Sequence, residues 1–173
     1  MTEIVHVVVM GVAGSGKTTV ARILAERLGW PYAEADEFHP PENIAKMSAG
    51  EPLTDEDRWP WLRAIRDWMT ARSRAGESAV VTCSALKVAY RDLLREAEGR
   101  VRFVHLTAQA PLLEDRMEHR AGHFMPTSLL TSQLATLEPL TDAEDGVTIS
   151  VEESPDAVAD RAMAALHLSE ERS

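Results

Sequence analysis

Three glycines, one lysine and three hydroxyl-bearing residues fall within nine positions near the start of the chain, in Gly11-Val12-Ala13-Gly14-Ser15-Gly16-Lys17-Thr18-Thr19. Glycine allows backbone conformations in which several N–H groups point toward one anion. A lysine in the first turn of a helix opposes the helix dipole unless an anion lies beside it. The spacing of Gly11, Gly16 and Lys17-Thr18 is that of a P-loop, which predicts binding of a nucleoside triphosphate.

We expect each residue of this turn to make a different contact with ATP or with its Mg²⁺ ion. Lys17 would reach the β- and γ-phosphates as a catalytic cation, and the Thr18 hydroxyl would ligate Mg²⁺. The alternative is a glycine-rich turn with a chance lysine. The apolar strand pattern before the turn and the helical pattern after it disfavour that alternative. The remaining ATP contacts in this turn are expected at Gly11, Ala13, Gly14, Ser15, Gly16 and Thr19.

Two carboxylates, Glu34 and Asp36, follow a second short apolar segment, Tyr32-Ala33. At the end of a strand, residues spaced i and i+2 point to one side, toward the edge where open parallel sheets bind ligands. An alcohol that attacks phosphorus must lose its proton, so Asp36 is the candidate catalytic base or orienting group for a substrate hydroxyl. The alternative is that Asp36 contacts Mg²⁺ through water.

Cations are scarce in this sequence, which carries a net charge of −10 and only three lysines. Lys87 and Arg91 lie one turn apart in a helix predicted from Ala85 to Glu98, so they are expected on one face of it. Near the N-terminus of a helix a cation is unfavourable without a nearby anion. We therefore expect both residues to hold a substrate carboxylate or the transferring phosphate.

Arg116 and Arg120 are a second pair of cations, one turn apart in a helix predicted to start near Pro111. A break at Gly122 to Pro126 ends that helix. We expect both arginines to bind the ATP phosphates, with Arg120 as a catalytic residue that stabilises charge in the transition state. The alternative for each of these arginines, and for Arg91, is a solvated helix face.

Five apolar, mostly β-branched runs alternate with helical patterns along the chain. Such alternation predicts an α/β fold whose parallel sheet is covered by helices on both faces. Residues 39–74 are interpreted as a helical insertion between the second and third strands. The expected strands lie at 4–10, 32–33, 79–83, 101–106 and 147–151. The expected helices cover the stretch from the P-loop to 28, then 41–47, 60–74, 85–98, a stretch from 111, 129–137 and 157–168.

Composition limits the partners and the setting of the protein. A net charge of −10 and a pI near 5.0 argue against broad binding of nucleic acid or of anionic membranes. The single cysteine, Cys83, excludes an internal disulfide and suits a reducing compartment. The N-terminal residues show no signal-peptide pattern, and no run is long enough to span a bilayer. We therefore expect one cytoplasmic domain over 1–173.

Taken together, these residues resemble the gluconokinases, a small family similar to the shikimate kinases and nucleoside monophosphate kinases. The likeness covers nearly the whole chain. The P-loop is shared by many families, so the likeness depends mainly on narrower motifs. Among them are Asp36-Glu37-Phe38-His39-Pro40, Gly50-Glu51-Pro52-Leu53-Thr54-Asp55-Glu56-Asp57-Arg58, Trp61-Leu62, Cys83-Ser84-Ala85-Leu86-Lys87, Tyr90-Arg91-Asp92-Leu93-Leu94-Arg95 and Ser132-Gln133-Leu134-Ala135-Thr136-Leu137-Glu138-Pro139.

The resemblance implies the reaction ATP + D-gluconate → 6-phosphogluconate + ADP with Mg²⁺, carried out by a three-layer α/β/α P-loop kinase. It implies a five-stranded parallel sheet of order 2-3-1-4-5, a helical substrate cap at 39–74 and an arginine-bearing lid at 116–126. It also implies a homodimer. Relatives often carry Asp-Gly-Asp where this chain has Glu34-Ala35-Asp36. Because glutamate reaches further than aspartate, a direct metal role for Glu34 is doubtful.

Four further side chains are candidates for substrate contacts. His39 could bind substrate hydroxyls or be structural, and Arg58, which follows three acids, could instead make an intrahelix salt bridge. Gln133 could touch the substrate or only support packing, and His123 belongs to the helix break. Two other functions stay open: a kinase for another small acid or polyol such as shikimate, and a regulator that binds ATP without transferring phosphate.

Overall fold

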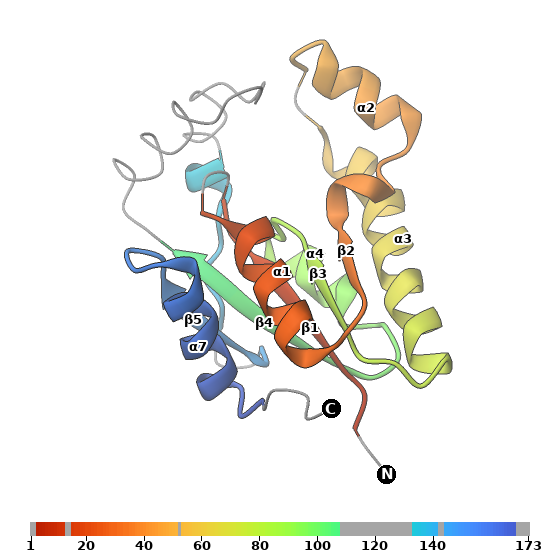
Figure 1. Ribbon diagram of the computed structural model, residues 1–173. Coiled ribbons are helices and arrows are strands. Elements are labelled where there is room, and N and C mark those ends of the chain that lie inside the picture. Colours follow the sequence, from red (N-terminus) through yellow and green to blue (C-terminus); the bar gives the residue numbers. More distant parts are fainter. Residues whose placement is uncertain (1–2, 13–14, 52, 108–132, 142–143, 169–173) are drawn as a thin grey trace.

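The computed structural model describes residues 3–12, 15–51, 53–107, 133–141 and 144–168, and Figure 1 shows their arrangement. Five parallel strands form one sheet in the order β2-β3-β1-β4-β5, which confirms the predicted order. The strands are β1 (Val5–Met10), β2 (Tyr32–Glu34), β3 (Ala79–Thr82), β4 (Arg100–Thr107) and β5 (Gly146–Ser150).

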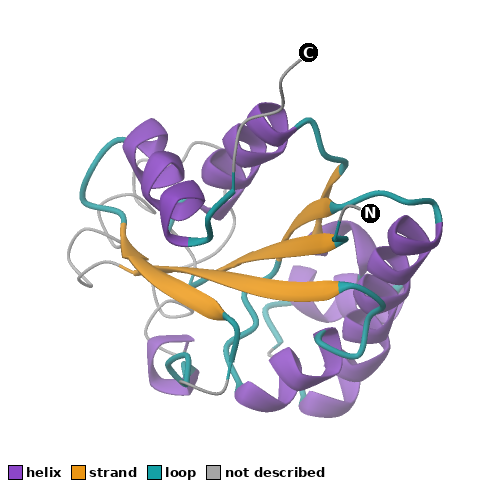
Figure 2. Ribbon diagram, turned by 90° about the horizontal axis from the view of Figure 1, so that it is seen from below, coloured by secondary structure: helices purple, strands orange, loops and turns teal. Residues whose placement is uncertain are grey.

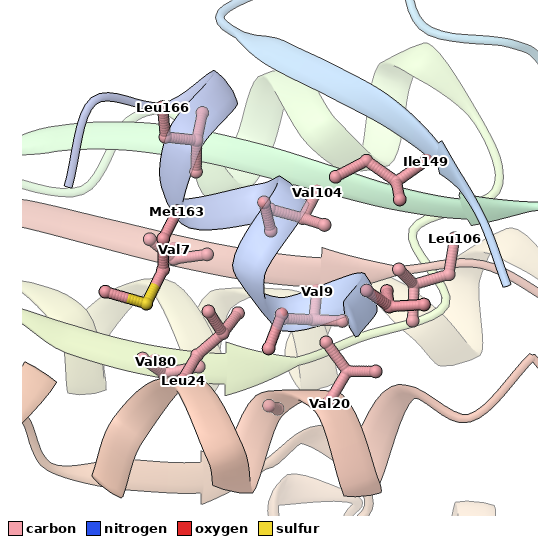
Figure 3. Packing of buried hydrophobic residues seen from close by; sticks show 14 of the residues in the cluster. Val7, Val9, Val20, Leu24, Val80, Val104, Leu106, Ile149, Met163 and Leu166 are labelled. Atoms are coloured by element: carbon pink, nitrogen blue, oxygen red, sulfur yellow. The ribbon is translucent and has the colours of Figure 1, made fainter. Parts of the chain in front are cut away.

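Helices cover both faces of the sheet, as the three-layer prediction requires (Figure 2). β1 is buried along its whole length, and its side chains alternate between two cores. Val5, Val7 and Val9 pack with α1 (Lys17–Leu28) and α7 (Pro155–Ala165), in the cluster drawn in Figure 3. Val8 and Met10 pack on the other side with α3 (Asp55–Arg74) and α4 (Val88–Leu94).

The carboxyl ends of the five strands meet at one edge of the sheet because the strands are all parallel. The chain leaves β2 at this edge through the short 3-10 helix η1 (Ala35–Phe38) and continues into α2 (Pro41–Ser48), at the top of Figure 1. The helices α2 and α3 are the insertion expected at 39–74. Its role as a substrate cap stays a prediction.

α3 begins at Asp55 and not at Pro60, so the predicted start is wrong. The reason is a capping box. The Thr54 hydroxyl accepts a hydrogen bond from the Asp57 N–H at 3.2 Å, and the Asp57 carboxylate accepts one from the Thr54 N–H at 2.9 Å. Three acids in the first turn also suit the positive end of the helix dipole. These contacts extend the helix in front of Pro60, which is accommodated inside it.

α4 also departs from the prediction, which placed its start at Ala85. The helix begins at Val88, and Lys87 is its N-cap residue. Ala85 has a φ of 45°, in the left-handed region that interrupts a right-handed helix. Lys87 therefore lies in front of the first helical turn instead of inside it.

The other elements follow the predicted pattern with small shifts at their ends. The last helix, α7, starts at Pro155 with Ser154 as its cap, slightly before the expected Ala157. Of the helix expected at 129–137, residues 133–136 are seen to be helical, and the helix expected from 111 lies outside the described residues. Within the described ranges, no helix is both long enough and apolar enough to cross a membrane.

Candidate active site

The predicted P-loop connects β1 to α1 at the carboxyl edge, and geometry favours glycine at both of its ends. Gly11 has a φ of +148°, and a Cβ there would lie 2.7 Å from the carbonyl oxygen of Leu106 on β4. Gly16 is the N-cap residue of α1 and has a φ of 88°. A side chain is strained at both places, so the turn keeps the open backbone that a P-loop needs.

Lys17 is the first residue of α1, and its side chain folds back over the turn. Its Nζ donates to the carbonyl oxygens of Gly11 at 3.0 Å and Val12 at 3.1 Å. Ser15 braces the same turn, since its buried hydroxyl donates to the Val12 carbonyl at 2.8 Å. Thr18 follows in the first helical turn and is half-buried. The ammonium group thus lies beside the turn where phosphates are expected.

Thr19, the last residue of the predicted ATP-binding run, is exposed on α1. Its contact with ATP, like those of the other described P-loop residues, stays a prediction. Several further predicted residues of the nucleotide site and the lid fall outside the described residues, and their roles stay predictions as well: Ala13, Gly14, Arg116, Arg120, His123 and the lid at 116–126.

Asp36 lies in η1, on a backbone that is fixed immediately before it. The Ala35 N–H donates to the Thr82 hydroxyl at 3.4 Å, and the Ala35 carbonyl accepts a hydrogen bond from the indole N–H of Trp61 at 2.7 Å. Asp36 itself is exposed. A carboxylate on a fixed turn with access to solvent is well suited to meet an incoming hydroxyl group.

Glu34 is in a different position from the one expected. The premise that Glu34 and Asp36 follow strand alternation is wrong, because β2 ends at Glu34 and the chain turns into η1. The Glu34 carboxylate accepts a hydrogen bond from the Tyr32 hydroxyl on the same strand. Burial, together with this bond, raises the pKa of Tyr32, so the hydroxyl remains a donor. Glu34 therefore has a local partner on β2, which argues against a metal role.

Cys83, which follows β3, links Lys17 and Asp36 in space. Burial raises the pKa of its thiol to about 12. The Lys17 charge lowers this pKa and the Asp36 charge raises it. Cys83 follows β3, which lies between β2 and β1 in the sheet, and its N–H donates to the Val9 carbonyl at 3.1 Å. Lys17 follows β1 and Asp36 follows β2, at the same edge of the sheet. The fold therefore brings the two catalytic candidates into one neighbourhood from different loops.

His39 follows η1 and is held by residues of the helical insertion. Its ring stacks on Trp61, with ring centroids 4.3 Å apart and an interplanar angle of 10°. The Asn43 side-chain amide donates to His39 Nδ1 at 3.2 Å, which leaves the ring proton on Nε2. Burial lowers the pKa of His39, while the Asp36 charge counteracts this effect and the Arg58 charge adds to it. His39 thus has a structural role, and its contact with substrate stays a prediction.

Four side chains from the starts of α3 and α4 form a group that we call the cation cluster: Asp55, Arg58, Lys87 and Tyr90. Lys87 Nζ lies 3.3 Å and 3.4 Å from the two carboxylate oxygens of Asp55. The hydroxyl of the buried Tyr90 donates to Asp55 and accepts a hydrogen bond from Arg58 Nη1 at 3.1 Å. The charged groups of Arg58 and Lys87 also lie 5.6 Å and 5.5 Å from the centroid of the Tyr90 ring.

The cation cluster is locally positive and open to solvent. Two cations and one carboxylate leave it with one net positive charge, on a chain whose net charge is −10. The Arg58 side chain is 28% exposed and that of Lys87 is 33% exposed. The hydrogen bond to Asp55 raises the pKa of Lys87, and the bond from Tyr90 is the main reason that the pKa of Asp55 is lowered. The intrahelix contact of Arg58 with Asp55 is longer, at 3.8 Å, than its bond to Tyr90.

Arg91 lies outside the cation cluster, and its predicted role as a carboxylate or phosphate ligand is wrong. Its side chain is 0% exposed and forms an ion pair with Glu144, which is 1% exposed. The guanidinium also donates to the carbonyls of Ala85 at 2.8 Å and Pro139 at 3.2 Å, so each of its nitrogens has a partner. Burial alone would raise the pKa of Glu144, but the hydrogen bonds from Arg91 and Thr141 outweigh it and lower the pKa. Arg91 is therefore a structural residue.

Sequence reasoning missed three residues of this site: Asp55, Trp61 and Tyr90. Each lies within a motif that carries the family resemblance, and that membership was the only signal available. Their contacts join residues that are 26 positions apart for Trp61 with Ala35 and 35 positions apart for Tyr90 with Asp55. Gln133, which was predicted to touch the substrate, is half-buried, and that contact stays a prediction.

A parallel sheet of order 2-3-1-4-5, with a P-loop after its central strand, places the chain in the class of small P-loop kinases. Comparison with known proteins agrees with this class. The AAA domain family matches residues 7–125. A shikimate kinase structure from Aquifex aeolicus shares the fold, with a TM-score of 0.62 and 15% identity over 94% of this chain and 96% of that chain.

Nearer relatives define the family. A gluconokinase of Gluconobacter oxydans is 54% identical over 151 residues, which are 87% of this chain and 85% of that protein. The thermoresistant gluconokinase of Escherichia coli is 41% identical over 152 residues, 87% of each chain. A gluconokinase structure from Sinorhizobium meliloti has a TM-score of 0.86 and 48% identity, covering 96% of this chain and 94% of that chain. The chain belongs to the gluconokinase family, which confirms the resemblance seen in its motifs.

Proposed function

We propose that this chain transfers the γ-phosphoryl group of ATP to the terminal hydroxyl of D-gluconate, giving 6-phospho-D-gluconate and ADP. The observation that carries the proposal is the meeting of two catalytic candidates at one sheet edge. Lys17 follows β1 and Asp36 follows β2, and β3 is the strand between them, so both residues lie at the carboxyl edge of the sheet. The cation cluster adjoins Asp36, because Trp61, three positions after Arg58 on α3, donates a hydrogen bond to the carbonyl of Ala35. Relatives named as gluconokinases support the choice of substrate.

In this mechanism the chain supplies positioning and charge neutralisation more than covalent chemistry. Lys17 would move from the Gly11 and Val12 carbonyls to the β- and γ-phosphates of ATP. Asp36 would accept the proton of the substrate's terminal hydroxyl as the oxygen attacks phosphorus. Arg116 and Arg120, which lie outside the described residues, keep their proposed role at the ATP phosphates.

Mg²⁺ fits this site as an ion shared between the protein and ATP. Among the described residues, no three His, Cys, Asp or Glu side chains come together as a metal site. Magnesium at phosphate-transfer sites needs few protein ligands, because substrate phosphates and water complete its shell. Thr18, half-buried in the first turn of α1, would supply one hydroxyl ligand. The bound ion would neutralise phosphate charge as the phosphoryl group is transferred.

The substrate carboxylate is assigned to the cation cluster. The protein's overall charge of −10 would repel gluconate. At physiological salt, however, charges are screened within about 8 Å, so nearby cations decide the affinity. Lys87 and Arg58 are both partly exposed, and together they outweigh Asp55. With Arg91 buried, Arg58 replaces it as the partner of Lys87 in this proposal.

Two further expectations accompany the proposed function. The family resemblance implies a homodimer, and the single buried cysteine suits a reducing compartment such as the cytoplasm. His39, His123 and Gln133 are proposed to contact the hydroxyl groups of the substrate. These expectations stay predictions.

The proposed reaction is tested by coupled ADP release with Mg²⁺, ATP and a panel of sugar acids, polyols and nucleotides. Gluconate should stimulate ADP release well above the rate seen without an acceptor. Shikimate and nucleotides should leave the rate near that background. If gluconate leaves ADP release unchanged, the proposed reaction is wrong.

Replacing the lysine of the cation cluster should reduce the preference for the acid. Glucitol lacks the carboxylate of gluconate but keeps its hydroxyl pattern, so it should be a poor substrate mainly through a raised KM. Lys87→Met should raise the KM for gluconate far more than that for glucitol, because only gluconate loses an ionic contact. Steady-state kinetics with both acceptors measure the difference.

Lys46→Met is the matched control for this variant. Lys46 is also a lysine paired with an aspartate of α3, with its Nζ 2.7 Å from Asp57, but it lies outside the cation cluster. Lys46→Met should leave the ratio of the KM for gluconate to the KM for glucitol unchanged. An equal loss for both acceptors in Lys87→Met, together with a raised KM for ATP, would assign Lys87 to the phosphates and make Arg58 the next residue to test.

A further inference from the structure

Lys87 lies where an irregular segment of backbone meets the first turn of α4. Residues 83–86 belong to neither a helix nor a strand, and Ala85 has a left-handed φ of 45°. Lys87 is the N-cap residue of α4, but its own side chain makes no capping hydrogen bond. Its carbonyl accepts hydrogen bonds from the Tyr90 and Arg91 N–H groups, so α4 holds Lys87 on its C-terminal side. Contacts from elsewhere in the chain hold the irregular segment before Lys87 and the free amide after it, and with them the reach of its ammonium group.

Glu138 supplies two of those contacts, one on each side of Lys87. Its backbone N–H donates to the Leu86 carbonyl at 2.7 Å. Its carboxylate accepts a hydrogen bond from the Val88 N–H at 2.8 Å. The second bond satisfies a free amide at the start of α4 and provides the cap that Lys87 lacks. Glu138 is 50 residues away from Val88 in the sequence, so this is a tertiary contact.

A second set of contacts holds the same region from the inside. Arg91 Nη1 donates to the Ala85 carbonyl and Nη2 to the Pro139 carbonyl, so one side chain joins the two segments that Glu138 also joins. The buried Glu144 fixes Arg91 in place. Three hydrogen bonds thus attach the segment Glu138-Pro139 to residues 85–91: they involve the Leu86 carbonyl, the Val88 N–H and the Arg91 guanidinium.

We propose that Glu138 is a positioning residue that sets the location of Lys87 and, through it, the affinity for the acidic substrate. This inference rests on the proposed role of Lys87 at the gluconate carboxylate. It explains what Glu138 and Pro139, the last two residues of the motif that begins at Ser132, do in the protein. The proposed reaction assigns no role to these two residues. The Glu138 carboxylate is engaged with the backbone of α4, and Glu138 acts on the substrate only through Lys87.

Glu138 is a better residue to change than Arg91 or Glu144. Removing one partner of a buried ion pair leaves an uncompensated charge and endangers the fold. Glu138 is exposed, so its loss opens a hydrogen bond to water without leaving a buried charge. Glu96→Ala is the matched control, because it removes an exposed carboxylate that pairs with Arg66 at 3.0 Å and does not touch residues 85–88.

Steady-state kinetics of four variants test the proposal. Glu138→Ala should raise the KM for gluconate about fivefold, as expected for one lost hydrogen bond, with the KM for ATP nearly unchanged. Glu138→Gln should retain most of the affinity, because its amide oxygen can still accept the Val88 N–H. Glu96→Ala should behave like the unchanged protein. In a Lys87→Met background, Glu138→Ala should have little further effect on the KM for gluconate, because the residue that it positions is gone.

Amide hydrogen exchange separates this inference from the proposed function. Exchange of the Val88 N–H should become faster in Glu138→Ala and stay slow in Glu138→Gln. If Lys87→Met leaves the KM for gluconate unchanged, the carboxylate role of Lys87 fails, whatever the exchange shows. If Val88 exchange is unchanged in Glu138→Ala, or if Glu138→Ala raises the KM equally with and without Lys87, the positioning role is overturned. Should Glu138→Ala not fold, Glu138→Asp takes its place with the same criteria, because its shorter side chain withdraws the carboxylate from the Val88 N–H while the backbone N–H can still donate to the Leu86 carbonyl.

Discussion

Lys17→Ala should lower kcat about a hundredfold or more, because the charge of this residue matters most as the γ-phosphoryl group moves. In the structure its ammonium group contacts the Gly11 and Val12 carbonyls, beside the turn that would hold the phosphates. The backbone of the turn is set by Gly11 and Gly16, so the variant should keep its fold. ADP release with saturating gluconate and ATP measures kcat, and thermal unfolding checks the fold.

Lys46→Ala is the control for the loss of a lysine as such. Lys46 lies on α2 in an ion pair with Asp57, away from the P-loop, and its replacement should change kcat little. Near-normal turnover in Lys17→Ala would remove the P-loop lysine from the mechanism. Loss of turnover together with loss of the fold would show that Lys17 is structural.

Asp36→Asn should reduce kcat about a hundredfold or more while gluconate still binds, since an amide keeps the size of the carboxylate but cannot accept the proton. The change is confined to the side chain, because the backbone beside it is held through Ala35 by Thr82 and Trp61. Coupled ADP release measures kcat, and calorimetric titration with gluconate measures binding.

Glu37→Gln is the matched control for Asp36→Asn. Glu37 is the next residue of η1, is also an exposed carboxylate and undergoes the same change from acid to amide. It should leave kcat nearly unchanged. If Asp36→Asn abolishes gluconate binding but keeps a high residual kcat, Asp36 is a binding group and the base must be sought elsewhere.

The local parts of this protein could be predicted from the sequence because their causes are local. The P-loop follows from the spacing of Gly11, Gly16 and Lys17, and its position between a strand and a helix is confirmed. The capping pair of Thr54 and Asp57 also has a local cause, since both partners lie within one helical turn. The parallel sheet, with helices on both faces, was predicted from continuous apolar runs that alternate with helical patterns. A strand that is buried on both faces needs such a continuous run.

The helix starts were less certain, because single residues decide them. From the sequence we predicted that α3 begins at Pro60, whereas the capping box at Thr54 makes the helix begin at Asp55. We also placed the start of α4 at Ala85, which has a left-handed φ; the Ala85 carbonyl accepts a hydrogen bond from Arg91, and Arg91 is held by Glu144, 53 positions away. Propensity is a weak guide at such positions, because tertiary contacts override it.

Only the tertiary structure determines which cations are buried in ion pairs and which remain exposed to a substrate. In the sequence, Lys87 and Arg91 are two cations one turn apart, and nothing in that spacing says which of them is buried. Arg91 is buried because Glu144, 53 positions away, pairs with it in the interior. Lys87 remains partly exposed because its partner, Asp55, lies on a different helix at the open edge of the sheet. Contacts between residues this far apart depend on how the whole chain packs, which the spacing of residues along one helix does not record.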